Sequence, residues 1–247
     1  MPRFFVDPSQ VEGDRIIIRG GDVNHIRNVL RMRTADGLSV SDGQGRDYYC
    51  HIEQMDPEKI CLRIDNSWDS YVELPVRLTL FQGIPKGDKM ELIIQKAVEL
   101  GAYRVVPVYT ERTVVRLDPK KEEKKLKRWQ MISESAAKQA GRGRVPQVGP
   151  AMTWQEALEL SRKMDGCLIP YERAKGMNVS RETIRSMKGC ASLAVFIGPE
   201  GGFSEKEIGT AMEAGAKPIT LGKRVLRTET AGLAILSILM YEFEEDV

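Results

Sequence analysis

The segment at 197–202 combines residue types and spacing that imply ligand chemistry. The stretch AVFIGPEGGFSEKEIG (194–209) begins with a β-branched and aromatic run typical of a buried strand, which GPEGG cannot continue. Ser204 and Glu207 have the spacing of a capping box, so a helix is predicted to start after the loop. A strand, a glycine loop and a helix in this order often bind phosphate. This loop, however, lacks a Lys followed by Ser or Thr and carries Glu200, which indicates a different ligand.

Two more loops of unusual composition follow predicted strands. They are LIPYERAKG (168–176) and LGKRVLRTETAG (221–232), and the latter carries Lys223, Arg224 and Arg227. In a parallel sheet such loops meet beyond the carboxyl ends of the strands, where ligands bind. Each loop alone is also consistent with a simple tight turn. Three of them at one edge favour a shared pocket, whose glycines let a flat heteroaromatic base approach the backbone.

The absence of a phosphate-binding motif limits which classes of ligand the loops could bind. No G-x-G-x-x-G is present, and Glu200 would oppose a pyrophosphate, so a dinucleotide is disfavoured. A phosphate-handling nucleotide enzyme is disfavoured by the missing Lys and by the lack of an evident metal cluster. A cofactor with a positive centre and no phosphate meets neither objection. S-adenosylmethionine, with its adenine and its sulfonium, is such a molecule.

Composition excludes several other classes of protein. Within 247 residues, 42% are hydrophobic and 29% charged, enough for a packed core in one or two domains. Four widely spaced cysteines and two histidines make a disulfide framework or a metal site improbable. The apolar stretch 233–241 is too short to span a bilayer, and the first ten residues lack the apolar core of a signal peptide. We therefore expect a cytoplasmic protein with no metal and no membrane contact.

Short β-like runs dominate residues 1–72, and one predicted helix interrupts them. Asp22 is predicted to cap this helix, whose apolar face comprises Val23, Ile26, Val29 and Leu30. Many short strands with one helix indicate a small barrel.

From Val76 onward the pattern changes, because predicted strands alternate with predicted helices. The long helix is expected to open at Asp118-Pro119, and Thr228 is placed to cap the final helix. This alternation predicts an α/β fold with a parallel sheet covered on both faces.

The motifs together resemble a known family. IGPEGGFSEKEI with LGKRVLRTETA is similar to the SPOUT-class methyltransferases, and more narrowly to the ribosomal RNA small subunit methyltransferase E family. PRFFV, HIRNVLRM, KMELIIQKAVELG and SESAAKQAGR match that family at corresponding places. The resemblance implies an N-terminal PUA-like RNA-binding β-barrel (1–72) and a C-terminal SPOUT methyltransferase domain (73–247) with a trefoil knot. It also implies a homodimer that methylates N3 of one uridine in 16S ribosomal RNA, in the decoding region of the small ribosomal subunit.

The three loops supply the predicted contacts to S-adenosylmethionine. These are Pro170, Tyr171, Glu172, Ile197, Gly198, Pro199, Gly201, Gly202, Leu221, Gly222, Val225, Leu226 and Thr228. Because the sulfonium is a good leaving group, the reaction needs no metal, but uracil N3 must lose its proton. Arg227 is predicted to lie against a uracil carbonyl, while Glu200 or Glu229 accepts the proton directly or through water. For Glu229, a negative charge that complements the helix dipole is an equally ordinary role.

Basic residues outside the loops are predicted to contact RNA. Arg27 and Arg31 are four apart on the predicted barrel helix, although an ordinary solvated helix face would show the same pattern. With a net charge of only +2, an RNA-binding surface must be a local patch. The predicted set is Arg3, His25, Arg27, Arg31, Arg33, Arg142 and Arg144.

Two other functions stay open at this point. A non-catalytic RNA-binding protein could have kept the SPOUT fold as a scaffold, although the complete glycine loops and LRTETA argue against this. A SPOUT methyltransferase acting on a ribose 2'-hydroxyl is the second alternative.

Overall fold

The chain forms two compact units. The computed structural model describes residues 1–115, 118–174 and 176–244, so Lys175 of the first predicted loop lies outside the described residues. Unit 1 comprises Met1–Glu73 with Ala137–Val145, and unit 2 comprises Leu74–Ala136 with Pro146–Val247. The sequence placed a boundary after residue 72, one residue before the observed division, but gave no sign that 137–145 returns to unit 1. Across the described ranges, no helix has both the length and the apolar character needed to cross a bilayer.

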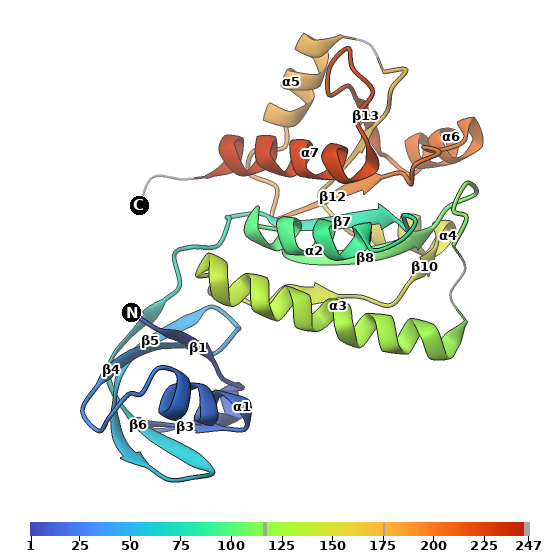
Figure 1. Ribbon diagram of the computed structural model, residues 1–247. Coiled ribbons are helices and arrows are strands. Elements are labelled where there is room, and N and C mark those ends of the chain that lie inside the picture. The colour runs from blue at the N-terminus through green and yellow to red at the C-terminus, as the bar shows by residue number, and fades with distance from the viewer. Residues whose placement is uncertain (116–117, 175, 245–247) are drawn as a thin grey trace. The chain divides into compact units, whose positions relative to one another are not determined.

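Unit 1 is a strongly curled six-stranded sheet (Figure 1). Its strands are β1 (Arg3–Phe5), β2 (Val11–Glu12), β3 (Arg15–Arg19), β4 (Gly37–Ser41), β5 (Arg46–Met55) and β6 (Lys59–Asp69). The spatial order is β1-β4-β5-β6-β3-β2, with only the β1–β4 pair parallel. Alternating residues such as Ile16, Ile18 and Ile60 point inward and are fully buried. The predicted barrel is therefore confirmed as a curled sheet, in which β1 and β2 are the edge strands of the described residues.

The helix of unit 1 differs from its prediction. It consists of α1 (Gly21–Asn24) followed by one π-helical turn (His25–Val29), in which the amide of Leu30 donates to the carbonyl of His25. The wider π turn rotates the residues that follow it. Val23 and Ile26 are consequently buried, whereas Val29 and Leu30 are exposed, so the predicted four-residue apolar face is wrong in its second half. The predicted capping by Asp22 is also wrong, because its carboxylate binds Lys138 at 3.2 Å.

Unit 2 is built on a parallel sheet, as predicted. The strands are β7 (Arg77–Gly83), β8 (Arg104–Tyr109), β9 (Gln147–Val148), β10 (Met152–Thr153), β11 (Gly166–Pro170), β12 (Ser192–Ile197) and β13 (Lys217–Ile219). The order is β10-β8-β7-β12-β11-β13, with β9 also paired to β8, and every pairing is parallel.

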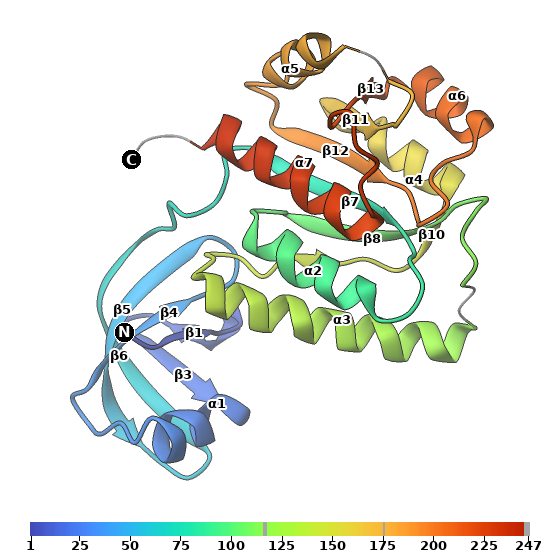
Figure 2. The ribbon, with the colours of Figure 1, turned by 45° about the horizontal axis from the view of Figure 1, so that its top comes forward.

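Helices cover both faces of this sheet (Figure 2). They are α2 (Lys89–Glu99), α3 (Pro119–Ala140), α4 (Trp154–Ser161), α5 (Met177–Arg185), α6 (Glu205–Glu213) and α7 (Thr228–Phe243). Side chains of α2, α3, α5 and α7 join one buried cluster with the sheet, and those of α4 and α6 join another. Asp118 accepts from the amide of Lys121 at 3.0 Å, so α3 begins where it was predicted.

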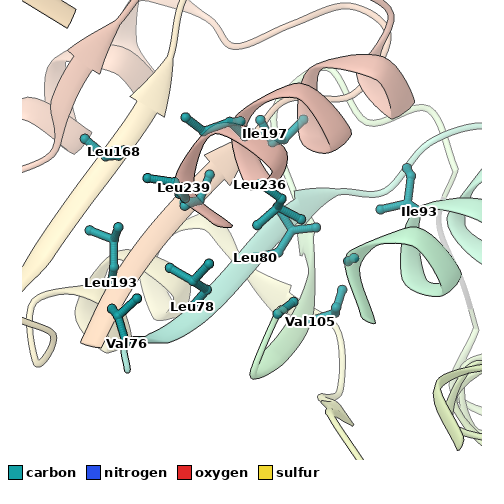
Figure 3. Close-up of a cluster of buried hydrophobic side chains, with 14 of the residues drawn as sticks. Val76, Leu78, Leu80, Ile93, Val105, Leu168, Leu193, Ile197, Leu236 and Leu239 are labelled. Carbon is teal, nitrogen blue, oxygen red and sulfur yellow. The ribbon is translucent and has the colours of Figure 1, made fainter. Parts of the chain in front are cut away.

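The larger cluster holds the sheet to α2 and α7. Figure 3 shows Leu78 and Leu80 of β7 and Leu193 of β12 packed with Leu236 and Leu239 of α7. All five are buried to 1% exposure or less, and burying a leucine side chain stabilises a fold by about 1.5–3 kcal/mol. This packing fixes α7 against β7 and β12. The trefoil knot implied by the resemblance stays a prediction.

Candidate active site

Three loops enclose a cavity of about 580 Å³ beyond the carboxyl ends of β11, β12 and β13. Every residue predicted to contact the cofactor lines this cavity, as do Glu200 and Arg227. The loops are far apart in sequence, so the parallel sheet has brought them together as expected. Five lining residues were not among the predicted contacts: Lys89, Phe203, Thr220, Arg224 and Ala231.

The glycine loop after β12 is built by local signals and by close packing. Ser204 accepts from the amide of Glu207 at 3.2 Å and Glu207 accepts from the amide of Ser204 at 2.8 Å, which confirms the capping box. The end of β7 lies directly beneath the loop, because a Cβ atom on Gly83 would be 2.6 Å from Cδ of Pro199. Only a glycine at 83 permits this approach.

Thr228 connects the three elements around the cavity. Its hydroxyl donates to the Gly198 carbonyl at 2.6 Å and accepts from Nε2 of the buried Gln82 at 2.9 Å. The prediction that Thr228 caps the final helix is wrong: Arg227 holds the N-cap position of α7 and makes no capping bond. The Thr228 hydroxyl instead joins β7, the glycine loop and α7, which are far apart in sequence.

Glu200 is held by the loop before α2. Its Oε1 accepts from the backbone amide of Lys86 at 3.1 Å and from Nζ of Lys89 at 3.0 Å. Burial raises the pKa of Glu200, but hydrogen bonds from Lys89 and from backbone amides outweigh it, so this pKa lies below its ordinary value. The hydrogen bond to Glu200 raises the pKa of Lys89, which keeps the ammonium charged. Glu200 is therefore an ionised carboxylate in fixed position and a weak base.

Glu229 and Arg227 stand in contrasting environments at the start of α7. Oε2 of Glu229 is buried without a hydrogen-bond partner and lies 3.5 Å from Nζ of Lys89. Glu229 does not line the cavity, whereas Arg227 lines it with an exposed side chain. Arg227 and Glu200 are thus the two predicted catalytic residues that line the cavity.

A fourth loop, not predicted to be functional, supports the glycine loop from β8. Nη1 of Arg112 donates to the carbonyl of Gly201 at 2.7 Å, and the amide of Glu111 donates to Glu207 at 2.8 Å. No local motif marks Thr110–Thr113, and only its position after a central parallel strand could have indicated this role.

Three of the residues predicted to contact RNA have protein partners within unit 1. Arg142 is only 4% exposed, and its guanidinium donates to both oxygens of Glu73 at 2.8 and 2.5 Å. Arg3 is paired with the buried Asp47 at 2.7 Å, and Arg144 donates to the Gln44 carbonyl at 2.9 Å. For Arg142, this burial does not support the prediction of an RNA contact. The Gly-Arg-Gly-Arg segment instead packs within unit 1, through contacts with Glu73 and Gln44.

The other predicted RNA contacts surround the π turn. His25, Arg31 and Arg33 are exposed, and Arg27 donates to the Asp56 carbonyl at 3.3 Å. Arg31 lies beyond the helix with φ of +55°, so the prediction that Arg27 and Arg31 share a helical face is wrong. The exposed basic side chains nevertheless stay within one short segment.

Comparison with known proteins assigns the family. The family model for the RNA methyltransferase domain matches residues 72–240, and that for the RNA methyltransferase PUA domain matches 18–65. The Bacillus subtilis protein named ribosomal RNA small subunit methyltransferase E is 34% identical over 250 residues, covering 99% of this chain and 98% of the relative. The chain belongs to the ribosomal RNA small subunit methyltransferase E family.

Solved structures of related proteins share the fold over nearly the whole chain. One, from Neisseria gonorrhoeae and bound to S-adenosyl methionine, has a TM-score of 0.83 at 33% identity and covers 98% of this chain and 97% of that one. A methyltransferase from Legionella pneumophila in complex with the same cofactor also has a TM-score of 0.83, at 30% identity, with coverages of 97% and 96%. The resemblance in the sequence motifs is thereby confirmed, and unit 2 matches the SPOUT fold expected for the family.

Proposed function

We propose that the protein transfers a methyl group from S-adenosylmethionine to N3 of one uridine in 16S ribosomal RNA. The observation that carries this proposal is the cavity formed by all three predicted loops, in a family whose relatives include cofactor-bound structures. The named ribosomal RNA methyltransferases among the relatives support the substrate class. The uracil N3 position follows from the motif resemblance.

The cavity fits the cofactor in size and in chemistry. Its volume of about 580 Å³ lies in the range of ordinary small-molecule sites. Gly202 leaves open space beside the backbone for an adenine, because an added Cβ there would meet nothing within 4 Å, and the carboxylates of Glu172 and Glu200 complement a positive centre. When bound, S-adenosylmethionine supplies the activated methyl group.

Arg227 carries the catalytic charge in this proposal. Uracil N3 attacks only after or while it loses its proton, and the negative charge then spreads onto the adjacent carbonyl oxygens. A guanidinium beside one carbonyl stabilises that charge and lowers the barrier. Arg227 lines the cavity, and the described residues offer its side chain no carboxylate partner, so its charge is available for this purpose.

The proton acceptor follows from the state of the two carboxylates. Glu200 is a weak base because its pKa is lowered, and Glu229 keeps one oxygen enclosed beside Lys89. We therefore assign both carboxylates to positioning and let the N3 proton pass to water. The rate of methyl transfer should then continue to rise with pH above neutrality. A general base with a pKa near neutrality would instead make the rate level off above that pKa.

Unit 1 supplies RNA contacts in this proposal. The exposed His25, Arg31 and Arg33, with Arg27 beside them, form a basic segment suited to phosphates, which position a substrate without selecting its base. We propose a homodimer on the basis of the resemblance, acting on the small ribosomal subunit in the cytoplasm.

The experiment uses the full chain, labelled S-adenosylmethionine and small ribosomal subunits that lack the modification. Digestion and mass analysis should identify 3-methyluridine at one position, and Arg227→Ala should lower kcat by about 100-fold with little change in cofactor affinity. A 2'-O-methylated nucleoside would support the ribose alternative. Binding of RNA without binding of the cofactor would support a non-catalytic adaptor. An Arg227→Ala variant with the rate of the unsubstituted protein would refute the role of Arg227.

A further inference from the structure

Lys89 is the first residue of α2 and lies between two carboxylates from other elements. Its Nζ is 3.0 Å from Oε1 of Glu200 in the glycine loop and 3.5 Å from Oε2 of Glu229 in the first turn of α7. Glu200 follows Lys89 by 111 residues, so neither contact is a local helix pair. One ammonium therefore joins three elements at the edge of the cavity.

The Lys89 contact is the one polar link found for Oε2 of Glu229. This oxygen is buried and accepts no hydrogen bond from the described residues, and 3.5 Å is the distance of an ion pair. Glu200 has a second partner, the amide of Lys86, which lies in the loop directly before α2. Without the ammonium, the two carboxylates that share it would have no cation between them.

We propose that Lys89 is a positioning residue, whose ammonium holds Glu200 and Glu229 together and so fixes the glycine loop against the start of α7 in the geometry that binds the cofactor. This inference rests on the proposed function, because the geometry matters for a ligand in the cavity. Lys89 acts on the reaction through the loop and takes no part in proton transfer, since the hydrogen bond to Glu200 raises its pKa.

The surroundings offer no substitute for Lys89 among the contacts of the described residues. The other charged groups on the adjoining elements are Lys86 and Asp88 before α2, Glu91, Lys96 and Glu99 on α2, Arg112 on the Gly201 carbonyl, Lys223, Arg224 and Arg227 in the third loop, and Glu242 on α7. None of these makes an ion pair with Glu200 or Glu229.

The test compares Lys89→Gln with Lys89→Arg, with the double variant Lys89→Gln/Glu229→Gln, and with Lys96→Gln. Lys96 is a matched control, because it lies on the same helix with similar exposure and pairs with Glu99 at 2.8 Å away from the cavity. The dissociation constant of S-adenosylmethionine is measured by calorimetry from about pH 5 to about pH 8. Because about a third of Lys89 and Glu200 is exposed, we expect Lys89→Gln to weaken binding about fivefold at the upper pH.

The pH dependence separates positioning by charge from simple loss of packing. In Lys89→Gln, repulsion between Glu200 and Glu229 should raise the pKa of one of these carboxyl groups. Protonation of that group at low pH then removes the repulsion, and the affinity for S-adenosylmethionine approaches that of the unsubstituted protein. Lys89→Arg and the charge-balanced double variant should bind within about twofold of the unsubstituted protein at every pH. An unchanged affinity in Lys89→Gln, an equal loss at every pH, or no rescue by the double variant would overturn the inference.

Amide hydrogen exchange without cofactor keeps the inference separate from the proposed function. The amides of residues 198 and 200–202 should exchange faster in Lys89→Gln than in Lys96→Gln at the same pH. If the unsubstituted protein bound no S-adenosylmethionine, the proposed function would fail, while faster exchange would still support the link through Lys89. Equal exchange in the two variants would refute that link.

Discussion

Gly83→Ala tests whether close packing of β7 against the glycine loop creates the cofactor site. The added Cβ would lie 2.6 Å from Cδ and 2.7 Å from the backbone N of Pro199. Carbon atoms in good contact are about 3.5–4.0 Å apart, so the backbone at Pro199 has to move by about 1 Å. The loop cannot yield easily, because Thr228 holds the neighbouring Gly198 carbonyl at 2.6 Å.

Overpacking of this kind costs about 1–3 kcal/mol. If the whole cost is paid when the cofactor binds, the affinity falls by about 5- to 150-fold. We expect Gly83→Ala to weaken S-adenosylmethionine binding within that range, as measured by calorimetry. Urea unfolding of the same variant shows how much of the cost falls on stability.

Gly209→Ala is the matched control, because Gly209 lies within α6 and an added Cβ meets nothing within 4 Å. This substitution should raise the free energy of unfolding by about 0.5–1 kcal/mol and leave cofactor affinity unchanged. If Gly83→Ala bound the cofactor as tightly as Gly209→Ala and unfolded at the same urea concentration as the unsubstituted protein, the packing argument would be refuted.

Three further predictions concern the site and unit 1. Thr228→Val should lower the free energy of unfolding by about 1–3 kcal/mol, because the Gln82 side-chain amide and the Gly198 carbonyl both lose the Thr228 hydroxyl. An unchanged free energy of unfolding in urea would contradict this prediction. Replacement of Arg31 and Arg33 by Glu should weaken RNA binding and flatten its dependence on salt, and an unchanged salt slope would remove both from the RNA contact. Because the pKa of Glu200 is lowered in the folded protein, its stabilising pair with Lys89 is complete above the ordinary carboxyl pKa of 4.5 and is lost as pH falls below it. Cofactor affinity should therefore stay level from about pH 8 to about pH 5 and drop only at lower pH, and a midpoint near neutrality would contradict this.

Local signals made part of the fold and of the site predictable from sequence. The strand, glycine loop and capping box of 194–209 depend on neighbours within a few residues, and the structure reproduces them. Alternation of strands and helices implied a parallel sheet, and that sheet places the three loops at one edge. The cofactor contacts could be predicted because they lie in those loops.

Contacts between distant segments were not predictable by the same reasoning. Thr228 was expected to cap its own helix, but its hydroxyl reaches Gln82, 146 residues away. Lys89 was not among the predicted site residues and Arg142 was predicted to contact RNA, whereas the fold places Lys89 beside Glu200 and Arg142 beside Glu73. Side-chain chemistry allows several partners for each of these groups, and only the folded chain selects among them.

The π turn shows a further limit. Helical periodicity of 3.6 residues put Val29 and Leu30 with Ile26 on one apolar face, but the π-helical turn, with its i→i+5 bond from Leu30 to His25, shifts the register. No residue type in this segment marks that change.

The central claim is that the loops at 168–174, 197–202 and 221–228 form the site for S-adenosylmethionine. A crystal of the full chain grown with this cofactor tests the claim most directly. We predict density for one molecule per chain within the 580 Å³ cavity, with its adenosyl group against the backbone of the three loops. Density at another place, or none at a concentration that saturates binding in solution, would contradict the claim.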